Sequence, residues 1–466
     1  MLTYSFTDIG SDSLYMHLYK CIKNDILEGK LCSGTKLPSK RSFAKNLALS
    51  NITVENAYAQ LQAEGYIYSL PRKGFFVSDI SNIEKSLSRE EAIKHIARKN
   101  NLAQNMDLVS NKANPDYFPF SIWTKLMREV INKNDAELMT VSPAGGIFEL
   151  RNAICNYLIE FRDMNVRPEQ VIIGAGTEYL YGLIIQLLGY DKIYAVENPG
   201  YKKIAKVYNS NNVECKVVSL DKEGIDIKRL EEIEADVLHI SPSHHYPTGI
   251  VTSIGRRYEV LGWASRKETN YIIEDDYDSE FRMTGKPIPT LQSIDMIEKV
   301  IYMNTFTKSL SPTIRISYMV LPYKLLDRFY SKLGFYSCTV SNFEQYTLAK
   351  FINEGYFEKH IIRMRNIYRN LRDRILDAIK KSRLNDYVKV SEEEAGLHFL
   401  LNIKTKLSDK ELKALAEKRG INISCISEYY FDDSIKNLEH TLIINYSSIR
   451  IEDIDKVINM LLECIK

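Results

Sequence analysis

Short apolar runs rich in β-branched residues alternate with segments of helical pattern from Leu108 onward. The runs are VII (171–173), IYAV (193–196), VLHI (237–240), YIIE (271–274), VIYM (300–303) and YMVL (318–321). Strands that alternate with helices in this way form a mostly parallel sheet covered by helices. Ligands of such sheets bind at the loops beyond the carboxyl ends of the strands. The alternation therefore predicts an α/β body and selects the loops in which to look for chemistry.

Length, charge and cysteine content limit what surrounds this body. A chain of 466 residues with 45% hydrophobic content is too long for one ordinary domain, so two or more are expected. Lys plus Arg number 62 against 60 for Asp plus Glu, so any basic surface must be local. The 7 cysteines form no CxxC pair, which favours reduced thiols. The N-terminus has no signal pattern and no apolar run nears the ~18 residues of a membrane span. We expect a soluble cytoplasmic protein.

The first 79 residues predict a small separate domain. Apolar residues recur every four positions from Leu14 to Ile26, typical of a helix that ends at Gly29. Two further helices are predicted, the third with Ser50 as its N-cap, followed by two β-like runs around a turn at 71–74. Three helices and a hairpin describe a winged helix, in which the third helix enters the major groove of DNA.

Positive charge gathers where phosphates would pass such a domain, near the start of the second helix and at the hairpin tip. The basic residues are Lys36, Lys40, Arg41 and Lys45, and then Arg72 and Lys73. By charge alone, a three-helix interaction module with solvated charges would be the more ordinary interpretation.

Motifs of this domain decide between the two interpretations. LPSKR, TVENAY, QAEGYI and KGFFV occur in an order and spacing that resemble the DNA-binding domain of GntR-type bacterial regulators almost throughout residues 14–77. The resemblance implies double-stranded DNA as a partner. The family often has an arginine where this chain has Asn51, so its base preference is expected to differ. The candidate DNA contacts are Asn51, Thr53 and Asn56 at base edges, Arg41 at a phosphate or base, and Lys40, Arg72 and Lys73 at phosphates.

A polar segment of mixed charge, ISNIEKSLSREEAIKHIARKNNLAQ, follows this domain. Its composition predicts a connector that is weakly helical in part. We therefore expect a DNA-binding domain at 1–79, a linker at 80–106 and a body at 107–466.

Two loops of the body could hold a flat phosphorylated ligand. GAGTEYL, after the strand at 171–173, opens a helix whose amides would cradle a phosphate at Gly176 and Thr177, although a GxG alone is often only a tight turn. ENPGY would bring Tyr201 to the same edge, where its ring could stack on a flat ligand. A single tyrosine is more often part of the packing.

Two later loops carry acidic, phenolic and basic groups. EDDYDSEF lacks histidines or cysteines at metal-ligand spacing, so we predict no metal. Asp275 would instead keep a pyridine nitrogen protonated, and Tyr277 would donate to a ring oxygen. In TFTKSLSPTIR, ordinarily a solvated loop, Lys308 could form an imine with an aldehyde on that ring, and Arg315 could reach the phosphate. In this order, the groups make up a pyridoxal phosphate (PLP) site.

From about Asp107 to the end, the chain is similar to fold-type I aminotransferases. The similar segments are SPAGGIFELRNAICNYL, GAGTEYL, ENPGY, SPSHHYPTGIV, IIEDDYDSEF and TFTKSLSPTIRISYMVLP. PSHHYPTG with EDDYDSEF resembles the MocR/GabR group, in which a GntR domain is fused to an aminotransferase-like body. The resemblance implies a large part to about 385, a smaller α+β part from 386, and a homodimer with each DNA-binding domain over the partner subunit. It makes Lys308 the Schiff-base lysine and assigns PLP contacts to Gly176, Thr177, Tyr201, Asp275, Tyr277 and Arg315.

One position departs from the aminotransferase pattern. Catalytic members carry an arginine for the substrate carboxylate in a late strand, whereas TLIINYSSI has Ile443 there. Arg450, Lys203 or another cation would have to replace that arginine. The departure favours a PLP-dependent transcription regulator, with PLP itself or an amine or amino acid as effector, over an aminotransferase with an accessory DNA-binding domain. Because this cation is missing, PLP itself is slightly favoured as the effector.

Overall fold

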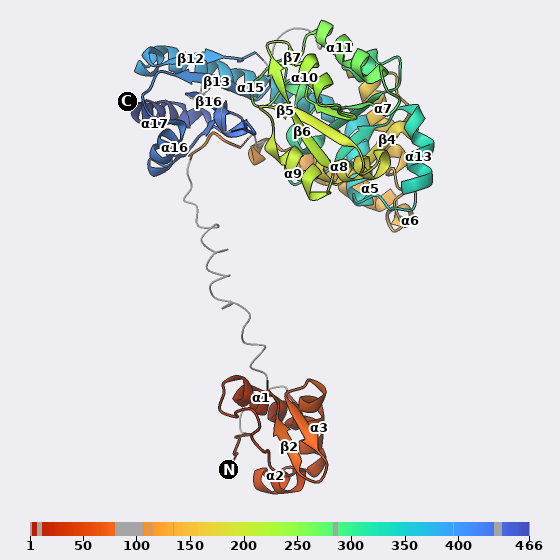
Figure 1. The fold of residues 1–466 in the computed structure, drawn as a ribbon, viewed down its shortest axis with the longest axis vertical. Helices are drawn as coiled ribbons and strands as arrows, with labels where there is room; N and C mark the ends of the chain where they lie inside the picture. Colours follow the sequence, from red (N-terminus) through yellow and green to blue (C-terminus); the bar gives the residue numbers. More distant parts are fainter. Residues whose placement is uncertain are drawn as a thin grey trace. The chain divides into compact units, whose positions relative to one another are not determined.

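The computed structural model describes residues 2–6, 12–79, 106–110, 114–133, 135–282, 288–394, 396–432 and 440–465. The chain divides into two compact units, Met1–Ala103 and Gln104–Lys466 (Figure 1). The segment predicted as a linker, ISNIEKSLSREEAIKHIARKNNLAQ, lies outside the described residues, so its character stays a prediction. Among the helices that the structure describes, none is both long and apolar enough to cross a bilayer.

The first unit is a winged helix, as predicted. Its elements are α1 (Leu14–Leu27), α2 (Lys40–Leu47), α3 (Asn51–Ala63), β1 (Ile67–Leu70) and β2 (Gly74–Val77). The two strands pair antiparallel, with Ile67 opposite Val77. The predicted N-cap of α3 is confirmed, because the Ser50 hydroxyl accepts a hydrogen bond from the Thr53 amide at 3.1 Å. The apolar stripe of α1 is buried against α3, which fixes the orientation of the candidate recognition helix.

The second unit is built on an eight-stranded sheet of order β4-β11-β10-β9-β8-β5-β6-β7. The strands are β4 (Val171–Gly174), β5 (Ile193–Asn198), β6 (Glu214–Asp221), β7 (Gly224–Ile225), β8 (Val237–Ile240), β9 (Tyr271–Asp275), β10 (Val300–Thr305) and β11 (Ser317–Val320). All six predicted strands are present. β11 runs antiparallel to both neighbours and β7 to β6, whereas the others are parallel, so the mostly parallel sheet is confirmed.

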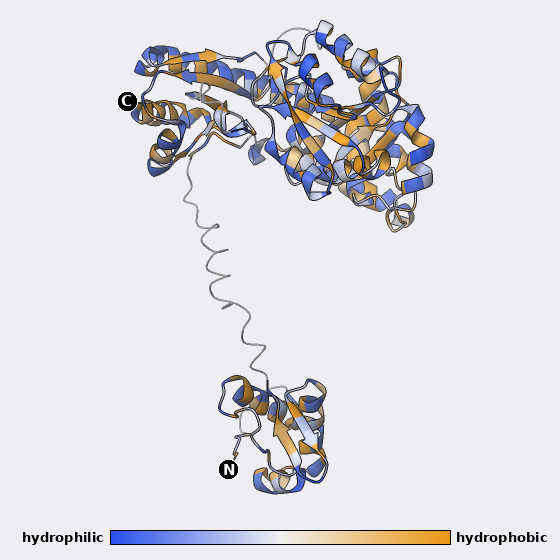
Figure 2. Ribbon diagram, viewed as in Figure 1, coloured by the Kyte–Doolittle hydropathy of each residue, from blue (hydrophilic) through white to orange (hydrophobic). Residues whose placement is uncertain are grey.

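Helices cover both faces of this sheet (Figure 1). They are α5 (Phe120–Lys133), α6 (Asp135–Leu138), α7 (Phe148–Arg162), α8 (Thr177–Leu188), α9 (Lys202–Ser210), α10 (Ile227–Glu232), α11 (Ile254–Ser265), α12 (Phe306–Ser309), α13 (Tyr323–Leu333), α14 (Asn342–Asn353) and α15 (Tyr356–Lys381). Ile172 packs in the cluster that contains α8 and α13, and its neighbour Ile173 packs in the one that contains α7 and α14. Strands buried on both faces are apolar at successive positions, and the central strands are mostly orange in Figure 2.

A smaller α+β part completes the second unit, as predicted. Its sheet has the order β12-β13-β16-β15, with strands β12 (Val388–Ser391), β13 (His398–Ile403), β15 (Ser424–Cys425) and β16 (Thr441–Asn445). Helices α16 (Asp409–Lys418) and α17 (Ile454–Ile465) belong to it. The strand that opens the unit, β3 (Met106–Asp107), pairs with β14 (Ile421–Asn422), so the start of the body is joined to its C-terminal part.

Candidate functional site

The predicted cofactor residues follow the carboxyl ends of neighbouring strands. Asp275 ends β9 and lies opposite Met303 of the parallel strand β10, so the segment with Lys308 leaves the sheet beside it. Gly176 follows β4, which points the same way as β10 because β11 runs antiparallel to both. Sheet topology thus brings these loops to one edge, where α/β proteins bind ligands.

The predicted phosphate residues meet at the N-terminus of α8. Gly176 is the N-cap of this helix, with a φ of 97°, and Thr177 is its first residue. A Cβ atom built on Gly176 would lie 2.3 Å from the Arg315 guanidinium, so any other residue here would require Arg315 to shift from this position. The first-turn amides and Arg315 therefore face the same space, which suits a phosphate.

Gly176, Thr177 and Arg315 are called the phosphate corner below. Glu178 also lies at this corner, although the sequence motifs did not single it out. Its carboxylate accepts a hydrogen bond from Arg315 at 2.9 Å and a close one from Lys203. Partial burial raises the pKa of Glu178, but the hydrogen bonds from Lys203 and Arg315 outweigh it and bring the pKa to about 2. Two cations and one anion leave the corner with one net positive charge.

Asp275 is buried and holds its two carboxylate oxygens in different environments. Oδ2 accepts a hydrogen bond from the Tyr181 hydroxyl at 2.7 Å and lies 3.5 Å from Nε2 of His239. Oδ1 is buried and has no hydrogen-bond partner within the described residues. A buried carboxylate oxygen requires a donor, and the N–H of a protonated pyridine is one. The residues present therefore fit the ring of PLP.

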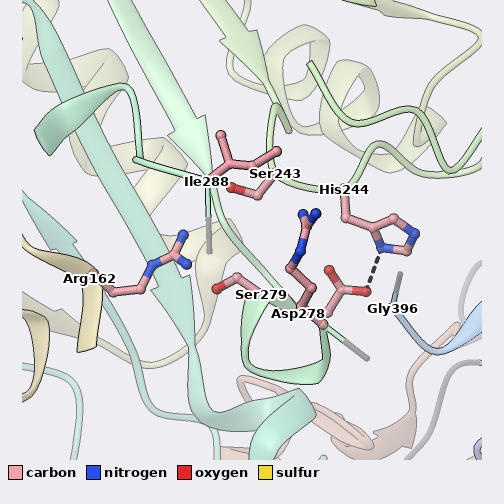
Figure 3. Close-up of a pocket in the computed structure, with 8 residues that line it drawn as sticks. Arg162, Ser243, His244, Asp278, Ser279, Ile288 and Gly396 are labelled. Atoms are coloured by element: carbon pink, nitrogen blue, oxygen red, sulfur yellow. Dashed lines mark hydrogen bonds and ion pairs between the residues drawn. The ribbon is translucent and has the colours of Figure 1, made fainter. Parts of the chain in front are cut away.

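Tyr277 contacts His244, a histidine to which the sequence motifs assign no role. Its hydroxyl lies 3.4 Å from Nδ1 of His244, which in turn contacts Oδ2 of Asp278 at 2.8 Å (Figure 3). Burial raises the pKa of Tyr277 well above its ordinary value, so the phenol keeps its proton and can donate it in a hydrogen bond. The cavity lined by His244 and Asp278 has a volume of about 20 Å³, roughly enough for one water molecule.

Lys308 lies on the short helix α12, directly after β10. Thr305 caps this helix by accepting the Thr307 amide at 3.2 Å, and His360 contacts the Ser309 carbonyl at 2.9 Å. Burial, with smaller effects that include the charge of Lys308, lowers the pKa of His398 well below its ordinary value. Lys308 is therefore near the neutral His398 of the smaller sheet.

Tyr201 and Ile443 are connected through a group of aromatic residues. Tyr201 is about half exposed, and its ring meets that of Tyr246 edge-on at 6.3 Å. Tyr246 and Tyr429 share a hydrogen bond of 2.9 Å and pack against a cluster that contains the fully buried Ile443.

The two cations considered as substitutes for the missing arginine have other partners. Arg450 contacts Asp453 at 2.8 Å on the surface, and Lys203 pairs with Glu178. Both cations are therefore already engaged with carboxylates.

The candidate DNA contacts differ in how free their side chains are. Asn51 and Asn56 are exposed on α3, and Arg41 is exposed on α2. The Thr53 hydroxyl shares a hydrogen bond with Ser50 at 2.8 Å, and Lys40 pairs with Glu55 at 2.6 Å.

The tip of the wing presents the remaining two candidates. Arg72 has a φ of 64° in the turn between β1 and β2, and both Arg72 and Lys73 are exposed there. Side chains on such a turn are available to a phosphate backbone that passes the wing.

The fold and the site define a winged-helix protein with a fold-type I aminotransferase body. The family described as aminotransferase class I and II matches residues 104–461, and the one described as bacterial regulatory proteins, gntR family, matches residues 14–77. The chain belongs to the MocR/GabR subfamily of GntR-type regulators.

Two regulators and one solved structure illustrate what the chain is similar to. The chain is 40% identical over 420 residues to the HTH-type transcriptional regulator YdeL of Bacillus subtilis, which covers 90% of each chain. It is 30% identical over 435 residues to the probable rhizopine catabolism regulatory protein MocR of Rhizobium meliloti, covering 90% of this chain and 87% of MocR. A crystal structure of Pyrococcus horikoshii kynurenine aminotransferase aligns with a TM-score of 0.69 and 23% identity over 83% of this chain and 98% of that one, which shows the fold.

Proposed function

We propose that this protein is a DNA-binding transcription regulator that holds PLP at Lys308. PLP, or an amine or amino acid that reaches it, acts as the effector that alters promoter binding. The observation that carries the proposal is Oδ1 of Asp275, which is buried and has no hydrogen-bond partner among the described residues, at the strand edge shared by Lys308 and the Gly176–Arg315 corner. A further relative, the pyridoxine biosynthesis transcriptional regulator PdxR of Corynebacterium glutamicum, is 28% identical over 425 residues. Genes of vitamin B6 or amino-acid metabolism are the proposed targets.

When bound, PLP supplies an aldehyde and an electron-withdrawing pyridine ring. Arg315 and the first amides of α8 would bind its phosphate, and Asp275 would accept a hydrogen bond from the pyridine nitrogen. Tyr277 would donate a hydrogen bond to the ring oxygen, because its phenol stays protonated. Tyr201 would stack on the ring, and the Lys308 amine would provide the covalent attachment.

The winged helix reads the promoter in this proposal. α3 enters the major groove with Asn51 and Asn56 toward base edges, while Arg41 and the wing residues Arg72 and Lys73 contact phosphates. A homodimer supplies two such domains, which suits two half-sites in the operator. The effector changes the affinity by changing how the two domains can engage both half-sites at once.

The test of this function uses the full-length protein. Wild type incubated with PLP should gain the visible absorbance of lysine-bound PLP, and borohydride should fix PLP to the peptide that contains Lys308. Lys308→Ala should lose both signals, whereas the control Lys324→Ala, a surface lysine of α13, should keep them. Gel shifts on the DNA upstream of its own gene, with and without PLP and candidate amines, then test the regulatory step. Unchanged absorbance in Lys308→Ala would overturn the attachment.

The alternative is an aminotransferase with an accessory DNA-binding domain. The cofactor residues favour it, but the buried Ile443 does not, because its side chain is apolar and fully buried and packs in a cluster with Leu400 and Ile426. Steady turnover of an amino acid with an α-keto acid would support the enzyme. Half-reactions without turnover would support the regulator.

A further inference from the structure

Three buried aromatic side chains, Tyr181, His239 and Tyr208, are linked to Asp275 by a chain of polar contacts. Tyr181 of α8 donates its hydroxyl hydrogen to Oδ2 of Asp275 at 2.7 Å. His239 of β8 lies on the other side of that oxygen, with Nε2 at 3.5 Å. The hydroxyl of Tyr208 on α9 contacts Nδ1 of the same histidine at 2.7 Å. The four groups come from α8, α9, β8 and β9.

The contact between the Tyr208 hydroxyl and Nδ1 bears on which nitrogen of His239 carries a hydrogen. Burial raises the pKa of Tyr208 well above its ordinary value, so the phenol keeps its hydrogen and can donate it. When the phenol is the donor, Nδ1 is the ring nitrogen without a hydrogen. A ring with one hydrogen then bears it on Nε2, the nitrogen that faces Asp275.

In that arrangement both neighbours of Oδ2 present hydrogen to it. The 3.5 Å separation from Nε2 is longer than an ordinary hydrogen bond, but an N–H dipole at that range still attracts a carboxyl oxygen in a buried setting. With Oδ2 engaged by Tyr181 and His239, the oxygen left for a ligand is Oδ1, which is buried and has no partner within the described residues.

We propose that Tyr208 donates its hydrogen to Nδ1 of His239, and that Tyr208, acting through His239, and Tyr181 are positioning residues that hold Oδ2 of Asp275 and turn its Oδ1 toward the pyridine nitrogen. The proposal rests on the proposed function, because it assigns these residues to the ring of PLP. Loss of the Tyr208 hydroxyl frees His239 to move its hydrogen to Nδ1, and Nε2 would then turn a lone pair toward the carboxylate. The pyridine proton would be held less firmly as a result.

A neighbouring tyrosine provides a matched control. Tyr194 is fully buried and stacks on Tyr208 with ring centroids 4.6 Å apart. Its hydroxyl is buried and has no hydrogen-bond partner in the described part of the chain. Tyr194→Phe therefore removes the same atom from the same aromatic stack without touching the chain to Asp275.

The first measurement is made on the full-length protein freed of PLP. With ¹⁵N-labelled histidine, the ring nitrogens of His239, assigned by comparison with His239→Gln, should show the Nε2–H tautomer in wild type and in Tyr194→Phe. Tyr208→Phe should shift the ring toward Nδ1–H. An unchanged tautomer in Tyr208→Phe would overturn the role of this tyrosine, whether or not the protein binds PLP.

The second measurement uses the protein loaded with PLP labelled at the pyridine nitrogen. In wild type and Tyr194→Phe the ¹⁵N shift should report a protonated ring. Tyr208→Phe and Tyr181→Phe should move it toward the unprotonated value and weaken PLP binding about fivefold or more. Shifts and affinities equal to those of wild type would overturn the proposal. Failure of wild type to take up PLP would overturn the proposed function instead, while the tautomer measurement would still decide whether Tyr208 sets the hydrogen on His239.

Discussion

The guanidinium of Arg315 lies across the backbone of Gly176, so close that a Cβ atom on residue 176 would be 2.3 Å from Nη2. The contact joins the loop after β4 to the segment between α12 and β11. It also explains why a glycine stands at the N-cap of α8, where the φ of 97° is already unfavourable for any other residue.

Replacing Gly176 with alanine should therefore weaken both the fold and the phosphate corner. The positive φ should cost about 1–3 kcal/mol in the free energy of unfolding, and Arg315 must move away from the first turn of α8. We expect PLP binding to weaken at least about tenfold, measured by absorbance titration. The control is Gly182→Ala, inside the same helix with nothing within 4 Å of the added atom, which should stabilise by about 0.5–1 kcal/mol. Equal PLP affinity in both variants would contradict the assignment of this corner.

The stability of the body should fall as pH rises through the neutral range because of Glu197. This buried residue of β5 accepts the Ser241 amide at 3.0 Å, and burial raises its pKa from 4.5 to about 8. Between those values the folded state binds the proton and the unfolded state has lost it. The free energy of unfolding therefore loses about 1.4 kcal/mol per pH unit from this group.

Glu197→Gln removes that contribution while keeping a side-chain oxygen for the Ser241 amide. Urea unfolding at pH 5, 6.5 and 8 should show the variant gaining stability relative to wild type as the pH rises. A constant difference between the two proteins over this range would show that Glu197 is ionised in the folded state.

Two exposed residues of the winged helix should affect DNA binding in different ways. Arg41→Ala should weaken binding to all sequences and reduce the salt slope by about one, because a phosphate contact releases a counterion. Asn56→Ala should relax the preference at one base pair by about 1–3 kcal/mol with little change in salt slope. Fluorescence anisotropy over a salt series measures both quantities. Lys20→Ala, which removes a lysine of α1 that is paired with Asp12, is the control and should change neither.

Ile443→Arg should destabilise the protein rather than create a carboxylate site. The side chain is fully buried in an apolar cluster with Leu400 and Ile426, so the new charge would be buried without a partner. We expect a loss of about 3 kcal/mol or more by urea unfolding, against about 0.5–1.5 kcal/mol for Ile443→Val. A stable Ile443→Arg variant that gains amino-acid turnover would show instead that this position faces the ligand.

The strands that the sequence predicted differ in burial from β6, which it missed. β8 and β10 are buried at every position, so their apolar runs are continuous and easily recognised. β6 lies near the edge of the sheet and is largely half-buried, and its mixed sequence ECKVVSLD carries no such run. The hydrophobic pattern of a strand reflects how deeply the strand is buried. A partly buried strand therefore carries a weaker pattern in its sequence.

The sequence by itself determined the two-part architecture and the chemical groups of the candidate site, because motifs such as GAGTEYL and TFTKSLSPTIR are local. Only the tertiary structure decided which side chains surround those groups. Tyr181, His239 and Tyr208 meet Asp275, and Glu178 meets Arg315, because the order of the strands brings β4, β8, β9 and β10 into one sheet. A pairing between residues so far apart along the chain depends on that order, and no spacing within a single motif records it.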